Sequence, residues 1–133
     1  MPDDTILDGE IAFLDENGNA DYNKTSNVMG SNPDRAIALQ MERGWLYFQV
    51  FDVLEYRGIP TTGDRLVIRD ALMYDIVPKL MCKHIVAVDM VYGTSAKKAL
   101  LDSELASGRE GIMLKNINSI YIPGKKRENT WYK

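Results

Sequence analysis

The stretch "WLYFQVFDVLEY", residues 45–56, is the strongest indicator of fold in this chain. It is dense in aromatic and β-branched residues, which favour extended structure. The segment "RGIPTTGD", residues 57–64, follows it with glycine and proline, which typically mark turns. The stretch therefore predicts a buried strand that ends in a turn.

A second strand is predicted near the N-terminus. "ILDGEIAFL", residues 6–14, is rich in apolar and β-branched residues and runs into "DENGN", residues 15–19. The Asn17-Gly18 pair within that segment is a strong hairpin signal. The chain is therefore expected to begin with a strand and a tight turn.

Three segments predict helices. Asn32 is a typical N-cap before Pro33, and Gly44 stands where a helix ends. Apolar residues from 64 to about 80 have helical spacing, with an end expected near the proline of that segment. The third helix is expected over 94–108, capped by Thr94 or Ser95.

The remaining apolar segments predict further strands. They are "HIVAVDMVY", "EGIMLKN", "SIYIPG" and "NTWYK", at residues 84–92, 110–116, 119–124 and 129–133. Strand runs interrupted by single helices, without a glycine-rich turn between strand and helix or a fixed repeat, favour an α+β fold. We predict mainly antiparallel β-sheets with flanking helices.

Length and composition favour a cytoplasmic protein. The 133 residues fit one domain with a real core, and the single Cys82 cannot form an internal disulfide. The N-terminus has no signal-peptide pattern, and apolar runs are interrupted by charge well before the roughly 20 residues of a membrane span. We therefore expect an intracellular, soluble protein without a membrane partner.

Charge is distributed unevenly along the chain, although the formal net charge is only −3. Residues 1–16 contain six acidic residues and no cation, whereas the last nineteen residues are rich in cations. These cations are Lys115, Lys125, Lys126, Arg127 and Lys133. A local basic strip can bind phosphates within an acidic domain, because screening limits the reach of the other charges.

Acidic, aromatic and basic residues recur beside glycine or inside predicted strands. Glu10 follows Gly9, Glu110 precedes a glycine, and Phe51 lies within the strongest strand. Carboxylates suit Mg²⁺, an aromatic face suits a base, and cations suit phosphates. Taken singly, each feature is explained as a turn former, a core aromatic or a solvated charge.

Together and in this order, the motifs resemble the covalent nucleotidyltransferases, most closely the adenylation domain of ATP-dependent DNA ligases. The resemblance covers nearly the whole chain. It is carried by "ILDGE" (6–10), "YFQVFDVL" (47–54), "EGIMLK" (110–115) and the end of the chain, with Tyr121, Pro123-Gly124, Arg127 and "WYK" (131–133). It implies a partial nucleotidyltransferase fold of the DNA ligase and mRNA-capping type.

The resemblance also implies roles for individual residues. Glu10 would contact the ribose or a metal, Phe51 would stack on adenine, and Glu110 would serve Mg²⁺. Lys115 and Lys133 would hold the phosphates of ATP. The basic residues Lys125, Lys126 and Arg127 would contact DNA or phosphate.

Three family features do not occur in residues 1–133. The nucleophilic lysine lies in a Lys-x-Asp-Gly motif, but the first lysine here is Lys24, after Asp8-Gly9. The oligonucleotide-binding barrel that usually follows is also missing, and the fifth motif stops at its first lysine. We therefore expect a partial adenylation domain of a ligase that seals nicked double-stranded DNA through lysine-AMP and DNA-adenylate intermediates. Alone it should not self-adenylate, and exposed strand edges should favour self-association.

Three alternatives remain at this point. RNA ligases and capping guanylyltransferases share the motifs, and the joining of RNA or DNA nicks would separate them. A short protein that binds nucleotide or nicked DNA without chemistry would bind without forming covalent AMP. A domain unrelated to nucleotides would be supported if Glu10→Ala and Glu110→Ala left nucleotide binding unchanged.

Overall fold

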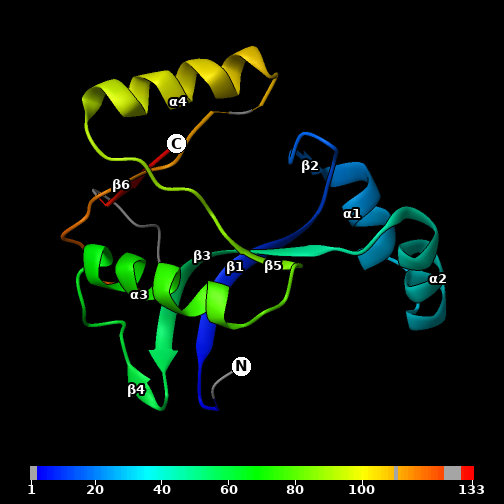
Figure 1. Ribbon diagram of the computed structural model, residues 1–133, viewed down its shortest axis with the longest axis horizontal. Coiled ribbons are helices and arrows are strands. Elements are labelled where there is room, and N and C mark those ends of the chain that lie inside the picture. The colour runs from blue at the N-terminus through cyan, green and yellow to red at the C-terminus, as the bar shows by residue number, and fades with distance from the viewer. Residues whose placement is uncertain (1–2, 110, 125–129) are drawn as a thin grey trace.

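Strand β3 (Tyr47–Tyr56) is the centre of the main sheet (Figure 1). It pairs antiparallel with β1 (Ile6–Leu14) and β4 (Ile59–Pro60), and parallel with β5 (Ile85–Ala87). The short β2 (Ala20–Asp21) pairs with the end of β1 across the predicted turn. The architecture confirms the α+β class with mainly antiparallel sheets. The computed structural model describes residues 3–109, 111–124 and 130–133.

The ladder between β1 and β3 contains a β-bulge. Asp8 pairs with Asp52, and the next residue, Gly9, pairs with Val50. Phe51 therefore has no partner on β1. A second register shift lies closer to the N-terminal end of β1. Bulges re-aim side chains, and this explains why the burial of β3 does not alternate strictly.

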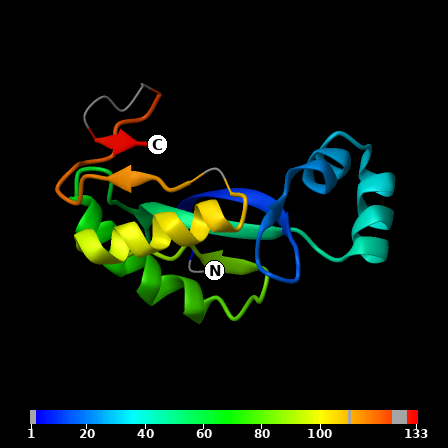
Figure 2. The ribbon, with the colours of Figure 1, turned by 90° about the horizontal axis from the view of Figure 1, so that it is seen from above.

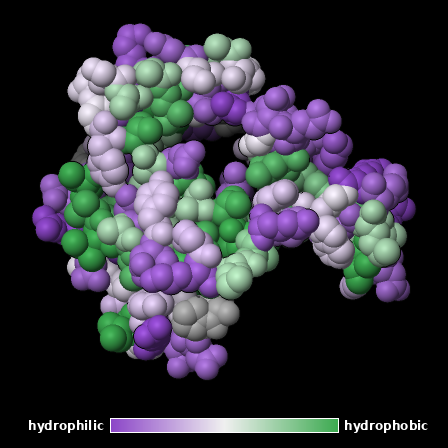
Figure 3. Space-filling model, in the orientation of Figure 1, coloured by the Kyte–Doolittle hydropathy of each residue, from purple (hydrophilic) through white to green (hydrophobic). Residues whose placement is uncertain are grey.

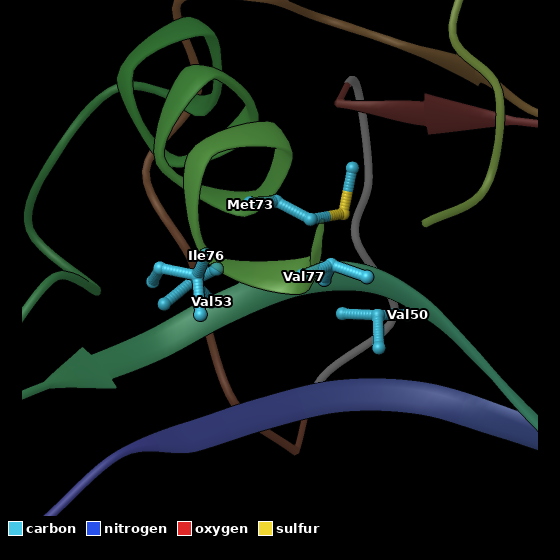
Figure 4. Packing of buried hydrophobic residues seen from close by; sticks show 5 residues of the cluster. All are labelled: Val50, Val53, Met73, Ile76 and Val77. Atoms are coloured by element: carbon cyan, nitrogen blue, oxygen red, sulfur yellow. The ribbon is translucent and has the colours of Figure 1, made fainter. Parts of the chain in front are cut away.

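The main hydrophobic core lies between β3 and helix α3 (Leu66–Lys79) (Figure 4). Val50 and Val53 of β3 meet three apolar side chains of α3. These are Met73, Ile76 and Val77. Because apolar burial is worth about 25 cal/mol per Å², this contact contributes much of the stability of the sheet. Pro78 lies in the last turn of the helix, so the predicted end near this proline is confirmed.

A buried ion pair joins β3 to α3. The guanidinium of Arg69 donates from Nε and Nη2 to the two carboxylate oxygens of Asp52, at 2.7 and 2.9 Å. Both residues are 1% exposed. Arg69 also donates to the backbone oxygen of Asp64 at 2.6 Å, while Asp52 accepts the amide of Val53 at 2.9 Å. These extra hydrogen bonds satisfy the two charges, which burial alone would destabilise.

Helices α1 (Tyr22–Met29) and α2 (Pro33–Arg43) form a separate lobe beside the end of β1 (Figures 1 and 2). Phe13 of β1 packs there with one buried residue from each helix, Val28 and Leu39. The predicted Asn32 cap of α2 is confirmed, because its side chain accepts from the amide of Arg35. Helix α1 was not predicted, since "YNKTSNVM" has few apolar residues to reveal its period.

Helix α4 (Thr94–Ala106) lies at the top of the view in Figure 1, beyond β6 and at the opposite end from β4, and it has no buried residue. The predicted cap by Thr94 or Ser95 is wrong. The helix begins after Gly93, whose φ of +86° favours glycine, and no side chain caps it. Among the described residues, no helix has the length and apolar character needed to cross a membrane.

The strand predicted over 84–92 ends early, at Ala87 in β5. Beyond it, the Tyr74 hydroxyl accepts the amide of Met90 at 2.8 Å and donates to the Val88 oxygen at 3.0 Å. The Tyr74 hydroxyl thus makes the backbone hydrogen bonds that a neighbouring strand would otherwise make.

A second tyrosine near this segment donates to α3. Burial and a hydrogen bond to Asp70 raise the pKa of Tyr92 to about 12, so its hydroxyl remains a donor at neutral pH.

Strands β6 (Leu114–Lys115) and β7 (Trp131–Tyr132) form a small second sheet. The strand predicted over 119–124 is wrong. Residues 116–121, which we call the strap, instead accept hydrogen bonds from the first backbone amides of α3. The amides of Leu66 and Val67 donate to strap carbonyls at 2.8 and 3.0 Å. These first-turn amides have no partner within their own helix, so the strap acts as its cap.

We predict that Gly9→Ala destabilises the fold by about 1 to 3 kcal/mol through overpacking. A β-carbon at this position would lie 2.5 Å from a Phe48 ring carbon and 2.6 Å from the Gln49 oxygen. Chemical denaturation measures the effect. Gly63→Ala is the control, because no atom lies within 4 Å of the added carbon. Equal stability of the two variants would contradict the prediction.

Arg69→Met should destabilise the protein by about 3 to 5 kcal/mol, because it leaves the buried Asp52 carboxylate unpaired. Arg35→Met, at an exposed position of α2, is the matched control. Thermal unfolding of both variants checks this. A loss no greater than in the control would show that the ion pair does not stabilise the fold.

Candidate functional site

The bulged Phe51 contacts the β6–β7 sheet. Its ring meets that of Trp131 edge to face, with centroids 6.3 Å apart. The Lys115 ammonium lies 4.9 Å from the Phe51 centroid and 4.1 Å from that of Trp131. It also donates to the Phe51 oxygen at 3.3 Å. We call these three residues the aromatic-lysine cluster.

The pairing of β6 with β7 explains this cluster. Lys115 pairs directly with Trp131, and directly opposed side chains in an antiparallel pair lie close enough to interact. A cation over an aromatic face is stabilised by the ring quadrupole. Lys133 follows the same strand and is exposed. Lys115, one of the two lysines predicted to bind phosphate, therefore contacts Phe51, the residue predicted to stack on adenine.

Glu10 lies on β1, opposite Gln49 of β3 and near the Phe51 bulge in the ladder. Its side chain is exposed. An exposed carboxylate fits Mg²⁺, which typically takes one or two carboxylates and fills its other positions with water and substrate phosphates. The described residues contain no group of three metal-ligating side chains.

Four predicted site residues lie outside the described part of the chain. They are Glu110, Lys125, Lys126 and Arg127. The structure therefore brings Phe51 and Lys115 together and places Glu10 on the neighbouring strand. The pairing of Glu10 with Glu110 stays a prediction.

Sequence reasoning missed a set of polar contacts that links α3, β1 and β3 next to the site residues. Arg69 lies 5.9 Å from the centre of the Tyr121 ring, and the Tyr121 hydroxyl donates to Asp8 at 3.0 Å. Asp8 precedes Glu10 on β1, and Asp52, which pairs with Arg69, follows Phe51 on β3. The available signal was the arginine within the apolar run "LVIRDAL" of α3. A buried arginine in such a run needs a carboxylate partner.

Arg109 joins the end of α4 to the turn after β1. Its guanidinium contacts Glu104 at 2.5 and 2.7 Å, and also contacts Asn19. This fixes α4 relative to the sheet. Figure 3 shows the surface indented between α4 and the α1–α2 lobe, with hydrophilic residues prominent on both sides.

The whole chain, residues 1–133, matches the protein family described as "ATP dependent DNA ligase domain". It is 31% identical over 129 residues to a probable DNA ligase of Streptomyces coelicolor, covering 96% of this chain and 25% of that protein. A probable DNA ligase of Pseudarthrobacter chlorophenolicus is 29% identical over 131 residues, covering 98% and 24%. The chain thus spans about a quarter of the length of these relatives.

A solved structure shares the fold. The ligase domain of M. tuberculosis LigD superposes with a TM-score of 0.70 at 24% identity. The match covers 96% of this chain and 36% of that one. The predicted nucleotidyltransferase-type fold is therefore confirmed.

Lys115→Met is expected to change the fluorescence of Trp131, because it removes the ammonium from the indole face. The measurement uses a Trp45→Phe background, which leaves Trp131 as the single tryptophan. Lys98→Met, on the exposed surface of α4, should leave the emission unchanged. An unchanged spectrum in Lys115→Met would contradict the aromatic-lysine cluster.

Proposed function

We propose, from the premise that this chain belongs to the ATP-dependent DNA ligase domain family, that it forms part of the nucleotide-binding unit of an ATP-dependent DNA ligase. The parent enzyme would seal nicks in double-stranded DNA and so serve replication, repair and recombination inside the cell. The observation that carries the proposal is the aromatic-lysine cluster. It joins an aromatic of β3 to a cation 64 residues later, at a bulge beside the strand of Glu10.

The roles that the family resemblance implies agree with the chemistry of each side chain. Phe51 offers a flat face for adenine, which is held by stacking. Lys115 and Lys133 neutralise phosphate oxygens, and Lys125, Lys126 and Arg127 extend this positive charge toward DNA. Glu10 and Glu110 supply oxygen ligands for Mg²⁺, which would offset further phosphate charge when bound.

Transfer of an adenylyl group needs charge neutralisation and a nucleophile. A lysine amine attacks the α-phosphorus of ATP, pyrophosphate leaves, and lysine-AMP forms. AMP then passes to the 5′-phosphate of the nick, and the 3′-hydroxyl displaces it. The lysines would stabilise the charge of these phosphoryl transition states, and Glu10 and Glu110 would hold a metal ion that adds to this effect. Residues 1–133 contain no Lys-x-Asp-Gly, so we expect residual, weak ATP binding without covalent transfer, because part of the pocket wall of the family is missing from them.

Self-association through β1 is a further part of the proposal. Among the described residues, the edge of β1 away from β3 is paired with β2 only at Phe13 and Leu14. Unpaired strand edges present free backbone donors and acceptors to a second chain. Sedimentation velocity over a concentration series tests this, and a monomer at all concentrations would contradict it.

We predict that the chain binds ATP in the presence of Mg²⁺ and that Phe51→Ala and Glu10→Ala each weaken this binding about tenfold or more. The first variant loses the stacking surface and the second loses a metal ligand. Isothermal titration calorimetry measures both. Trp45→Ala and Glu42→Ala are matched controls, because these residues are exposed and lie on or after α2.

The chemistry is tested with ATP labelled at the α-phosphate. No label should remain on the chain after denaturing electrophoresis. Stable labelling would contradict the predicted lack of self-adenylation. Absence of ATP binding by the unmodified chain would contradict the nucleotide-binding role.

A further inference from the structure

We propose that Tyr121 is a positioning residue that holds the strap against β1 and thereby sets the distance between the phosphate-binding lysines and Glu10. This inference rests on the proposed nucleotide-binding function for its consequence, and on the geometry of the strap for its mechanism. The tyrosine hydroxyl donates to an oxygen of Asp8 at 3.0 Å. The two residues are separated by 113 positions in the sequence.

Backbone hydrogen bonds fix one side of the strap to α3. Ser119 and Ile117 accept the amides of Leu66 and Val67, and the amide of Tyr121 donates to Thr62 at 2.9 Å. Arg69 adds a hydrogen bond to the Ser119 oxygen at 3.3 Å. The strap therefore follows the start of α3, which is itself held to β3 by the Arg69–Asp52 ion pair.

The bond from Tyr121 to Asp8 adds an attachment to a different strand. Asp8 lies on β1, opposite Asp52 and two residues before Glu10. The Arg69 guanidinium lies over the tyrosine ring, 5.9 Å from its centre, while the hydroxyl donates to the Asp8 carboxylate. A hydrogen bond to an ionised carboxylate is stronger than one between neutral groups. This contact connects the strap to the strand that carries the predicted metal ligand.

The strap is continuous with both described lysines of the site. Lys115 directly precedes it, and the amide of Asn116 donates to the oxygen of Thr130 at 2.8 Å, at the start of the chain segment that ends with Lys133. A strap that shifts on β1 would therefore move both lysines relative to Glu10. Phe51 would keep its place, because it lies in the sheet itself.

The experiment compares Tyr121→Phe with the unmodified chain by hydrogen exchange and by nucleotide titration. Tyr121→Phe keeps the ring over Arg69 and removes only the hydroxyl. Exchange should become faster at the strap-bonded amides of Leu66, Val67 and Asn116, and remain unchanged in the core of β3. Tyr22→Phe is the matched control, because Tyr22 is exposed and its hydroxyl has no hydrogen bond among the described residues.

The titration uses ATP with Mg²⁺ and adenosine as separate probes. Tyr121→Phe should weaken ATP binding about threefold to tenfold, corresponding to the loss of one hydrogen bond, and leave adenosine binding unchanged. Adenosine needs stacking on Phe51 but not the lysines. A merely structural role would lower both affinities together with the unfolding temperature.

The outcomes separate this inference from the proposed function. Unchanged hydrogen exchange overturns the positioning role, whether or not the chain binds nucleotide. Faster exchange with unchanged ATP affinity, or an equal loss for ATP and adenosine, also overturns it. An unmodified chain that binds neither probe overturns the nucleotide-binding proposal and the consequence drawn from it. Faster exchange with a selective loss of ATP binding supports both.

Discussion

The buried ion pair between Arg69 and Asp52 is the constraint on which the rest of the structure depends. Two charges at 1% exposure must be satisfied inside the protein, because water cannot solvate them there. Arg69 therefore requires the Asp64 oxygen, the Ser119 oxygen and the Asp52 carboxylate at once. This requirement fixes α3 on β3 and the strap on α3 with one side chain. Desolvation offsets much of the attraction within such a pair, so removing one partner destabilises the fold mainly by leaving a buried charge without a counter-ion.

The β-bulge at Phe51 relates this structural centre to the candidate site. In a regular strand, residues three apart point to opposite faces, so Val50 and Val53 would not both pack on α3. The register shift at Phe51 lies between them and allows both to face the core, while Phe51 meets Lys115 and Trp131 outside it. The same segment of β3 thus supplies a core residue, a charged anchor and an aromatic surface. Gly9 of β1, which pairs with Val50, permits this arrangement because the Phe48 ring lies where a side chain at position 9 would be.

Sequence reasoning found the elements whose signals are local. The strand around Phe51, the turn at Asn17-Gly18 and the cap at Asn32 depend on residues close together in the chain, and the structure has all three. It failed where hydrogen bonds between backbone groups far apart in the chain determine the local structure. Residues 119–124 have the composition of a strand, but their carbonyls serve the start of α3. The assignment of Lys115 and Phe51 to one site followed from motif resemblance alone, and their direct contact was not predicted, since no local pattern reveals a bulge or which strands will pair.

The contact between the two ends of the chain has a consequence for how the protein reaches its folded state. Asp8 meets a partner 113 positions later, and the first amides of α3 find their acceptors about fifty positions later in the chain. Closing such long loops costs entropy before any contact rewards it, which makes folding slow. During synthesis, Asp8 and the first amides of α3 have to wait for these partners until the strap has left the ribosome. Partly folded chains with an open strand edge are susceptible to aggregation in that interval.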